Sequence, residues 1–202
     1  LLNNNGISML VGRPSPDSNC SLIGIYDDAL TVKECESLIS IFEASEQSPG
    51  ETLGGYKPEW KKCMEISSDD MKFSSSSAIS TTILKGLKEC IEKYKMEYPA
   101  VSMISRWGVA DQFTFQKYET ADDGYKSWHC EHGSHPESSV RILAWMFYLN
   151  NAKSGTAFKH YPTVNAKMGR CVIWPAAWTH LHKGVTPNEG LKYIITGWFS
   201  HF

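Results

Sequence analysis

Two short segments hold side chains that could together bind a metal ion. The first is Trp128-His129-Cys130-Glu131, and the second is His180-Leu181-His182. Side chains at i and i+2 of a β-strand share a face, so a strand over 125–131 would project His129 and Glu131 together. A second strand over 179–185 would add His180 or His182, and alternation does not separate these two. Two imidazoles and one carboxylate can hold one side of a metal and leave the opposite positions open.

That ligand set is typical of non-haem Fe(II) oxygenases, although a His-x-Glu pair also occurs by chance. A lysine further along the chain adds to it. Lys192 lies in an apolar run, and alternation places it on the same face as Ile194 and Trp198. Buried lysines are rare unless they are paired. The partner would be a carboxylate of the protein or the carboxylate of a bound substrate.

The N-terminal half of the chain predicts helices. Residues 1–20 are rich in Asn, Ser, Pro and Gly and predict an irregular arm, and a short strand is expected over 22–26. Thr31 and Glu34 have the spacing of a capping box, and the apolar residues that follow predict a helix over 32–46. A second amphipathic helix is expected over about 77–96, with a cap at Ser74–Ser77.

From about residue 111 the apolar pattern changes to period two. Short runs rich in aromatic and β-branched residues predict strands, since these residues favour strands. The runs cover 111–118, 125–131, 140–149, 156–160, 170–174, 179–185 and 191–199. The chain is therefore expected to be mainly β, with a double-stranded β-helix (jelly-roll) core. Two N-terminal helices would pack on one sheet as supports.

Length and composition indicate one globular domain. The chain has 202 residues, 42% hydrophobic and 21% charged, and lacks the roughly 18 consecutive apolar residues of a membrane span. The net charge of −2 gives no reason to expect nucleic-acid binding. The lysines of Lys61-Lys62 and of Lys85 to Lys95 are interleaved with acids and predict solvated faces. Six cysteines without a C-x-x-C pair, and no signal-peptide pattern after Leu1, favour free thiols in the cytoplasm.

Several further motifs follow one another in a characteristic order. They are Tyr118, Tyr125 with His129 and Glu131, Arg141, Tyr148-Leu149-Asn150, Ser154-Gly155-Thr156-Ala157-Phe158, Gly169, His182-Lys183-Gly184, Lys192 and Trp198. In this order residues 111–200 resemble the 2-oxoglutarate- and Fe(II)-dependent dioxygenases, in particular the prolyl 4-hydroxylase-like branch. Glu131 stands where that branch usually has Asp, and Ser154 replaces the first residue of its Gly-Gly pair.

The resemblance implies roles for individual residues. It favours His182 over His180, because Gly184 and Lys192 follow His182 at the family's spacing. His129, Glu131 and His182 would then bind Fe(II). Lys192 would pair with the distal carboxylate of 2-oxoglutarate, with the Tyr148 and Thr196 hydroxyls assisting, and Tyr118 would line the same pocket.

The resemblance also implies an activity and a domain plan. With Fe(II), 2-oxoglutarate and O2, the protein would hydroxylate a C–H bond of an amino acid, a peptide or a small metabolite and release succinate and CO2. Residues 1–202 would form one domain, with helical support over 21–100 and the catalytic core over 111–200. The alternative is a cupin-like jelly-roll module that binds metal without 2-oxoglutarate turnover, with Lys192 paired internally.

Overall fold

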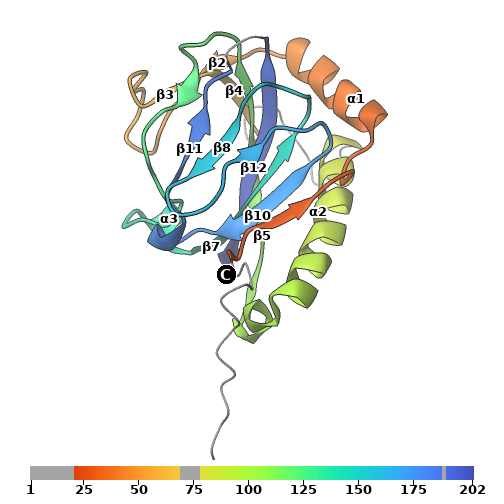
Figure 1. Ribbon diagram of the computed structural model, residues 1–202, viewed down its shortest axis with the longest axis vertical. Coiled ribbons are helices and arrows are strands. Elements are labelled where there is room, and N and C mark those ends of the chain that lie inside the picture. Colours follow the sequence, from red (N-terminus) through yellow and green to blue (C-terminus); the bar gives the residue numbers. More distant parts are fainter. Residues whose placement is uncertain (1–20, 69–77, 188–189) are drawn as a thin grey trace, which may run out of the picture.

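A computed structural model describes residues 21–68, 78–187 and 190–202 (Figure 1). The arm expected over 1–20 and the cap expected at Ser74–Ser77 lie outside these residues. Within them, neither long helix combines the length and apolar character that crossing a membrane requires.

The largest sheet in the described residues has seven strands in the order β1-β10-β7-β12-β5-β4-β2, all paired antiparallel. Its strands are β1 (Gly24–Tyr26), β2 (Ser48–Pro49), β4 (Met64–Ser67), β5 (Trp107–Tyr118), β7 (Arg141–Tyr148), β10 (Cys171–Pro175) and β12 (Lys192–His201). The long strands β5 and β12 lie side by side at its centre. The predicted mainly β architecture is confirmed.

Two smaller sheets accompany the large one. The strands β8 (Gly155–Phe158), β9 (Val164–Asn165) and β11 (His182–Val185) form a three-stranded sheet in the order β11-β8-β9. The short strands β3 (Lys61–Lys62) and β6 (Gly124–Tyr125) pair with each other. A large sheet with a small sheet over one face is consistent with the predicted jelly roll.

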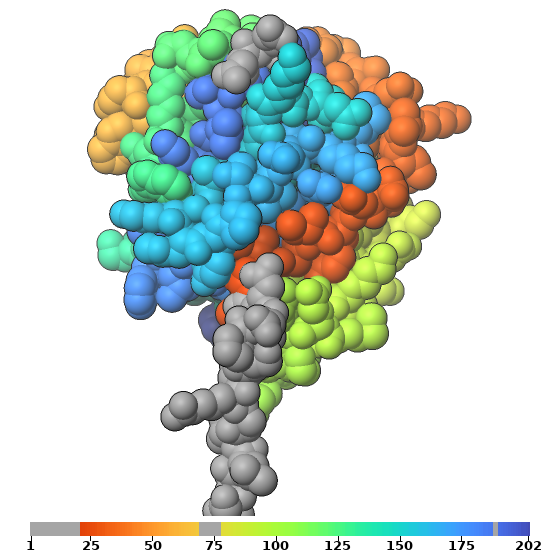
Figure 2. Space-filling view, viewed as in Figure 1, coloured from red at the N-terminus to blue at the C-terminus, as the bar shows by residue number. Residues whose placement is uncertain are grey.

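The two faces of the large sheet meet different partners. Alternate residues of β12, Tyr193, Ile195 and Phe199, belong to a core shared with helices α1 (Val32–Glu43) and α2 (Ala78–Glu97). Ile194, from the opposite face, belongs to a second core that includes Phe158 of β8. In Figure 1 both helices lie on one side of the molecule, with β8 and β11 on the other. Figure 2 shows the red segment that contains β1 between the yellow-green α2 and the light-blue part of the chain that contains β10.

The first helix begins at the residue that its sequence signature indicates. Thr31 accepts from the backbone N–H of Glu34, and the Glu34 carboxylate accepts from the backbone N–H of Thr31. This reciprocal cap satisfies two N–H groups that would otherwise lack partners. Cys35, Leu38 and Phe42 form the buried stripe of α1.

Two predicted strands are wrong in extent. In place of the predicted strand over 125–131, the structure has the two-residue strand Gly124–Tyr125. The chain is then irregular as far as Glu131. Residues 179–185 split into a 3-10 turn at Trp178–His180 and strand β11. A short helix, α3 (Pro136–Ser139), and a 3-10 helix at Pro99–Met103 complete the described elements.

Side-chain burial also differs from the expectation at particular residues. Trp128 is 42% exposed, because the predicted strand that contains it is not formed. Lys61 was expected to be solvated, yet it is 6% exposed and bonds Glu65 and the backbone oxygen of Glu51. Cys35, Cys63, Cys90, Cys130 and Cys171 are free thiols, as predicted, and Cys20 lies outside the described residues.

Candidate active site

One antiparallel bridge brings the two histidines of the candidate metal site together. The backbone N–H of His129 donates to the oxygen of His182 at 3.0 Å, and that of His182 donates to the oxygen of His129 at 2.9 Å. Directly opposed residues of an antiparallel pair project to the same side. The bridge therefore sets both imidazoles beside each other, although 126–131 is not a strand.

Each histidine is oriented by a backbone carbonyl. His129 Nδ1 lies 2.9 Å from the oxygen of Ser127, and His182 Nδ1 lies 2.9 Å from the oxygen of His180. A hydrogen bond at Nδ1 fixes the ring and leaves Nε2 available as a metal ligand. The Tyr125 ring stacks on His129 with a centroid distance of 3.6 Å.

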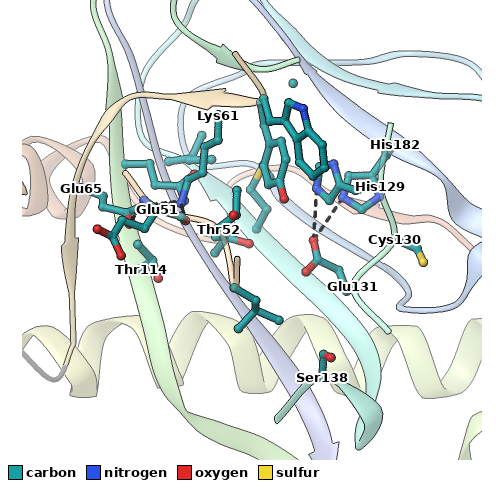
Figure 3. Close-up of a pocket in the computed structure, with 18 of the residues that line it drawn as sticks. Glu51, Thr52, Lys61, Glu65, Thr114, His129, Cys130, Glu131, Ser138 and His182 are labelled. Atoms are coloured by element: carbon teal, nitrogen blue, oxygen red, sulfur yellow. Dashed lines mark hydrogen bonds and ion pairs between the residues drawn. The ribbon is translucent and has the colours of Figure 1, made fainter. Parts of the chain in front are cut away.

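Glu131 completes the group. Its Oε1 lies 3.2 Å from His182 Nε2 and 3.7 Å from His129 Nε2. One ligand atom from each of the three residues lies within 4.8 Å of the others (Figure 3). Because metals bind neutral imidazole and ionised carboxylate, this donor set suits a divalent ion such as Fe(II).

The protonation states of His129 and Glu131 are those that metal binding requires. Burial, followed by the neighbouring His182, lowers the pKa of His129 to about 4, so its imidazole is neutral at pH 7. Burial by itself raises the pKa of Glu131. The hydrogen bond from His182, together with the electrostatic influence of the neighbouring histidines and of the Arg141 guanidinium, outweighs it and lowers that pKa to about 2. The carboxylate is therefore ionised.

A cavity of about 460 Å³ opens beside the cluster. Its volume is that of a small-molecule site. Side chains from the inward face of β12 line it at alternate positions, namely Lys192, Ile194, Thr196 and Trp198. The predicted shared face of Lys192, Ile194 and Trp198 is confirmed. Tyr118 and Thr196, for which the resemblance implied contact with the cosubstrate, line the same cavity as the metal cluster.

Lys192 is the buried cation of this cavity. Its side chain is 2% exposed, its Nζ donates to the oxygen of Val185 at 3.3 Å, and it lies 4.4 Å from the centre of the Tyr118 ring. Among the described residues no carboxylate lies within ion-pair distance of Nζ. Burial lowers the pKa of Lys192 to about 8. Such an ammonium is suited to an incoming carboxylate.

Tyr118, Thr196 and Tyr148, the three hydroxyl-bearing candidates, differ in their position relative to the cavity. The Tyr118 hydroxyl donates to Gln116 Oε1 at 2.7 Å, and Thr196 Oγ1 donates to the oxygen of Trp145 at 3.0 Å. Tyr148 is buried behind the wall, outside the lining residues, with its hydroxyl 2.6 Å from Thr156 Oγ1. Thr156 lines the cavity in its place, so Tyr148 reaches the cavity only through Thr156.

The opposite wall of the cavity holds polar groups that sequence reasoning missed. Figure 3 shows Lys61, Glu65 and Thr114 across the cavity from the metal cluster. Glu65 also accepts from the backbone N–H of Glu51 at 2.9 Å, which ties the segment before β3 to β4. Lys61 gave no signal of this role, because its partners, Glu65 of the following strand and the backbone oxygen of Glu51, are brought to it by the pairing of short strands.

His180 takes no part in the cluster. Its Nε2 lies 2.8 Å from the oxygen of Ser21 and its Nδ1 lies 2.9 Å from Thr179 Oγ1. Both ring nitrogens are therefore engaged away from the cavity. Of the two histidines that alternation left open, the structure brings His182 to His129 and Glu131.

Solved structures share this fold. A viral collagen prolyl hydroxylase from Paramecium Bursaria Chlorella virus-1, in its 2OG complex, is 16% identical over 90% of this chain and 97% of its own, with a TM-score of 0.66. A prolyl-4-hydroxylase from Pseudomonas putida is 13% identical over 91% and 94%, with a TM-score of 0.66. A Trichoplax adhaerens prolyl hydroxylase, in complex with a hypoxia inducible factor peptide fragment, is 13% identical over 90% and 84%, also with a TM-score of 0.66.

Sequence comparison finds one similar family. No curated protein sequence matches the chain. The family model described as "2OG-Fe(II) oxygenase superfamily" matches residues 113–200, which include all three residues of the metal cluster and Lys192. The C-terminal part of the chain is thus similar to the 2OG-Fe(II) oxygenase superfamily. This match and the shared fold support a 2-oxoglutarate-dependent dioxygenase, and the matched family implies Fe(II), 2-oxoglutarate and O2.

Proposed function

We propose that this 2OG oxygenase hydroxylates a C–H bond of an amino-acid or peptide substrate. Two imidazoles and one carboxylate share a cavity with a buried lysine that has no carboxylate partner among the described residues, and this observation supports the proposal most directly. Bound iron, with O2 and 2-oxoglutarate, would supply the oxidation and release succinate and CO2.

In this proposal each residue has one task. His129, Glu131 and His182 would hold the iron, each with one ligand atom. Lys192 pairs with the distal carboxylate of 2-oxoglutarate, and Tyr118 and Thr196 border the same space. Tyr148 orients Thr156 rather than touching the cosubstrate. Burial strengthens the lysine–carboxylate pairing because water competes less there.

A peptide substrate is supported by analogy alone. One protein of the same fold is described as a collagen prolyl hydroxylase, and another was solved with a peptide fragment. We also propose that residues 1–202 form one domain, and that the free cysteines reflect a cytoplasmic location.

An anaerobic titration tests the proposal. Adding Fe(II) and 2-oxoglutarate to the metal-free protein should produce the visible charge-transfer absorption of the iron–2-oxoglutarate chelate. Admitting O2 should then yield succinate, and a screen of peptides and amino acids should find one that stimulates its release. A metal-binding module without turnover would bind Fe(II) but give neither the absorption nor succinate.

The binding of 2-oxoglutarate should depend on pH through Lys192. Its pKa is lowered to about 8, so the ammonium is charged below that pH and is lost as pH rises through it. The Kd for 2-oxoglutarate should stay level from pH 6.5 to 7.5 and rise up to about tenfold per pH unit above 8. Anaerobic titrations across this range measure it. In Lys192→Arg the guanidinium stays charged, so its profile should be flat; a flat wild-type profile would contradict the prediction.

A further inference from the structure

The two oxygens of Glu131 have different partners. Oε1 faces the two histidines at 3.2 and 3.7 Å. Oε2 accepts a hydrogen bond from Trp198 Nε1 at 2.8 Å and lies 3.4 Å from Arg141 Nη1. One oxygen is thus directed to the proposed iron position, and the other is bound by the protein.

The contacts of Trp198 hold its indole in place for the hydrogen bond to Glu131 Oε2. It lies on β12, on the same face as Lys192, and the Arg141 guanidinium lies 3.5 Å from the centre of its ring. The pairing of β12 with β5 is interrupted there, because Gly197 pairs with Phe113 and Phe199 with Val109. Three β5 residues therefore lie opposite one β12 residue, as in a bulge, and bulges often re-aim side chains next to active sites.

A glutamate ligand needs such a partner more than an aspartate does. Its extra methylene adds a rotatable bond, so more side-chain freedom must be lost when it binds a metal. Its carboxylate could also turn and present both oxygens to the ion, occupying a position that the reaction requires to be open. A hydrogen-bond donor at Oε2 restricts the side chain before the metal binds and keeps the second oxygen away from the ion.

We propose that Trp198 is a positioning residue whose indole N–H binds Glu131 Oε2 and makes Glu131 a one-oxygen ligand through Oε1. The proposal rests on the proposed function, because it takes Glu131 as an iron ligand. It gives a specific task to Trp198, which belongs to the pattern shared with the resembling branch, in a chain where glutamate stands at position 131 in place of that branch's usual aspartate. An aspartate at 131 would be one methylene short of the same hydrogen bond.

Trp198→Phe tests the proposal, because phenylalanine keeps an aromatic ring under Arg141 and removes only the N–H donor. The readout is Co(II) binding to the metal-free full chain without 2-oxoglutarate, so turnover is not involved. The Kd for Co(II) should rise about 10- to 100-fold, the usual cost of losing a partner of a metal ligand. Trp178→Phe is the matched control, because Trp178 is 75% exposed and should leave Kd unchanged. Equal melting temperatures of the metal-free proteins would show that the fold is intact.

A double-mutant cycle with Glu131→Asp separates positioning from packing. In the aspartate background Trp198→Phe should change Kd by less than about twofold, because there is no hydrogen bond to lose. Wild-type affinity in Trp198→Phe, or the same loss in both backgrounds, would overturn the proposal. If Glu131→Asp binds no Co(II), Trp198→Phe with an unchanged melting temperature decides alone. If the wild type binds no Co(II), the proposed function itself fails.

Discussion

Replacing His129 or His182 by alanine should abolish both metal binding and succinate formation. Each change removes one of three ligands whose donor atoms lie within 4.8 Å of one another. The two remaining side chains offer too few donors to hold the ion in an open site. Fe(II) binding under anaerobic conditions and succinate release in air measure the two effects, and both should fall to background.

The control for this pair is His180→Ala. His180 is a buried histidine two residues from His182, but it bonds Ser21 and Thr179 instead of facing the cavity. Its loss should lower stability while metal binding persists in the folded protein. Unchanged turnover in His129→Ala or His182→Ala would reject the ligand assignment, and loss of metal binding in a folded His180→Ala protein would reject the choice between the two histidines.

Replacing Lys192 by alanine should mainly weaken the binding of 2-oxoglutarate. Truncating one partner of a buried ion pair costs about 3 kcal/mol, which corresponds to a Kd about 10²-fold higher. Co(II) binding should be unaffected, because Lys192 makes no contact with the metal cluster. Anaerobic titration with 2-oxoglutarate measures the change.

Lys183→Ala is the matched control for Lys192. Lys183 is on β11, outside the cavity lining, with its Nζ 5.0 Å from the centre of the Trp128 ring. Its removal should leave 2-oxoglutarate binding unchanged. An unaltered Kd in Lys192→Ala would show that another group receives the distal carboxylate. The internally paired lysine of a cupin-like module would then become the better interpretation.

Local patterns were sufficient for the elements whose residues interact along the chain. The capping box at Thr31 and Glu34 fixed the start of α1, because its hydrogen bonds join residues three apart. Alternation on β12 predicted that Lys192, Ile194 and Trp198 share a face, because the geometry of a strand allows no other arrangement. The mainly β core followed from the same periodicity.

Three features of the site could not be predicted from the sequence and became visible only in the tertiary structure. The sequence alone predicted a strand through Trp128 to Glu131, whereas only an isolated bridge between His129 and His182 aligns the ligands. The partners of Lys61 could not be read from its neighbours, because they include Glu65 of the next strand and the backbone of Glu51. Likewise, no local signal joins Trp198 to Glu131 across 67 positions.

The sequence by itself determined the periodicity of each element and the types of side chain available for chemistry. Only the tertiary structure decided which oxygen of Glu131 faces the histidines, which of His180 and His182 joins them, and that Lys192 is buried without a carboxylate partner among the described residues. The physical reason is the sequence separation over which each kind of interaction acts. Backbone geometry repeats over a few residues, whereas burial and charge pairing depend on segments that are distant in the chain and meet only when it folds.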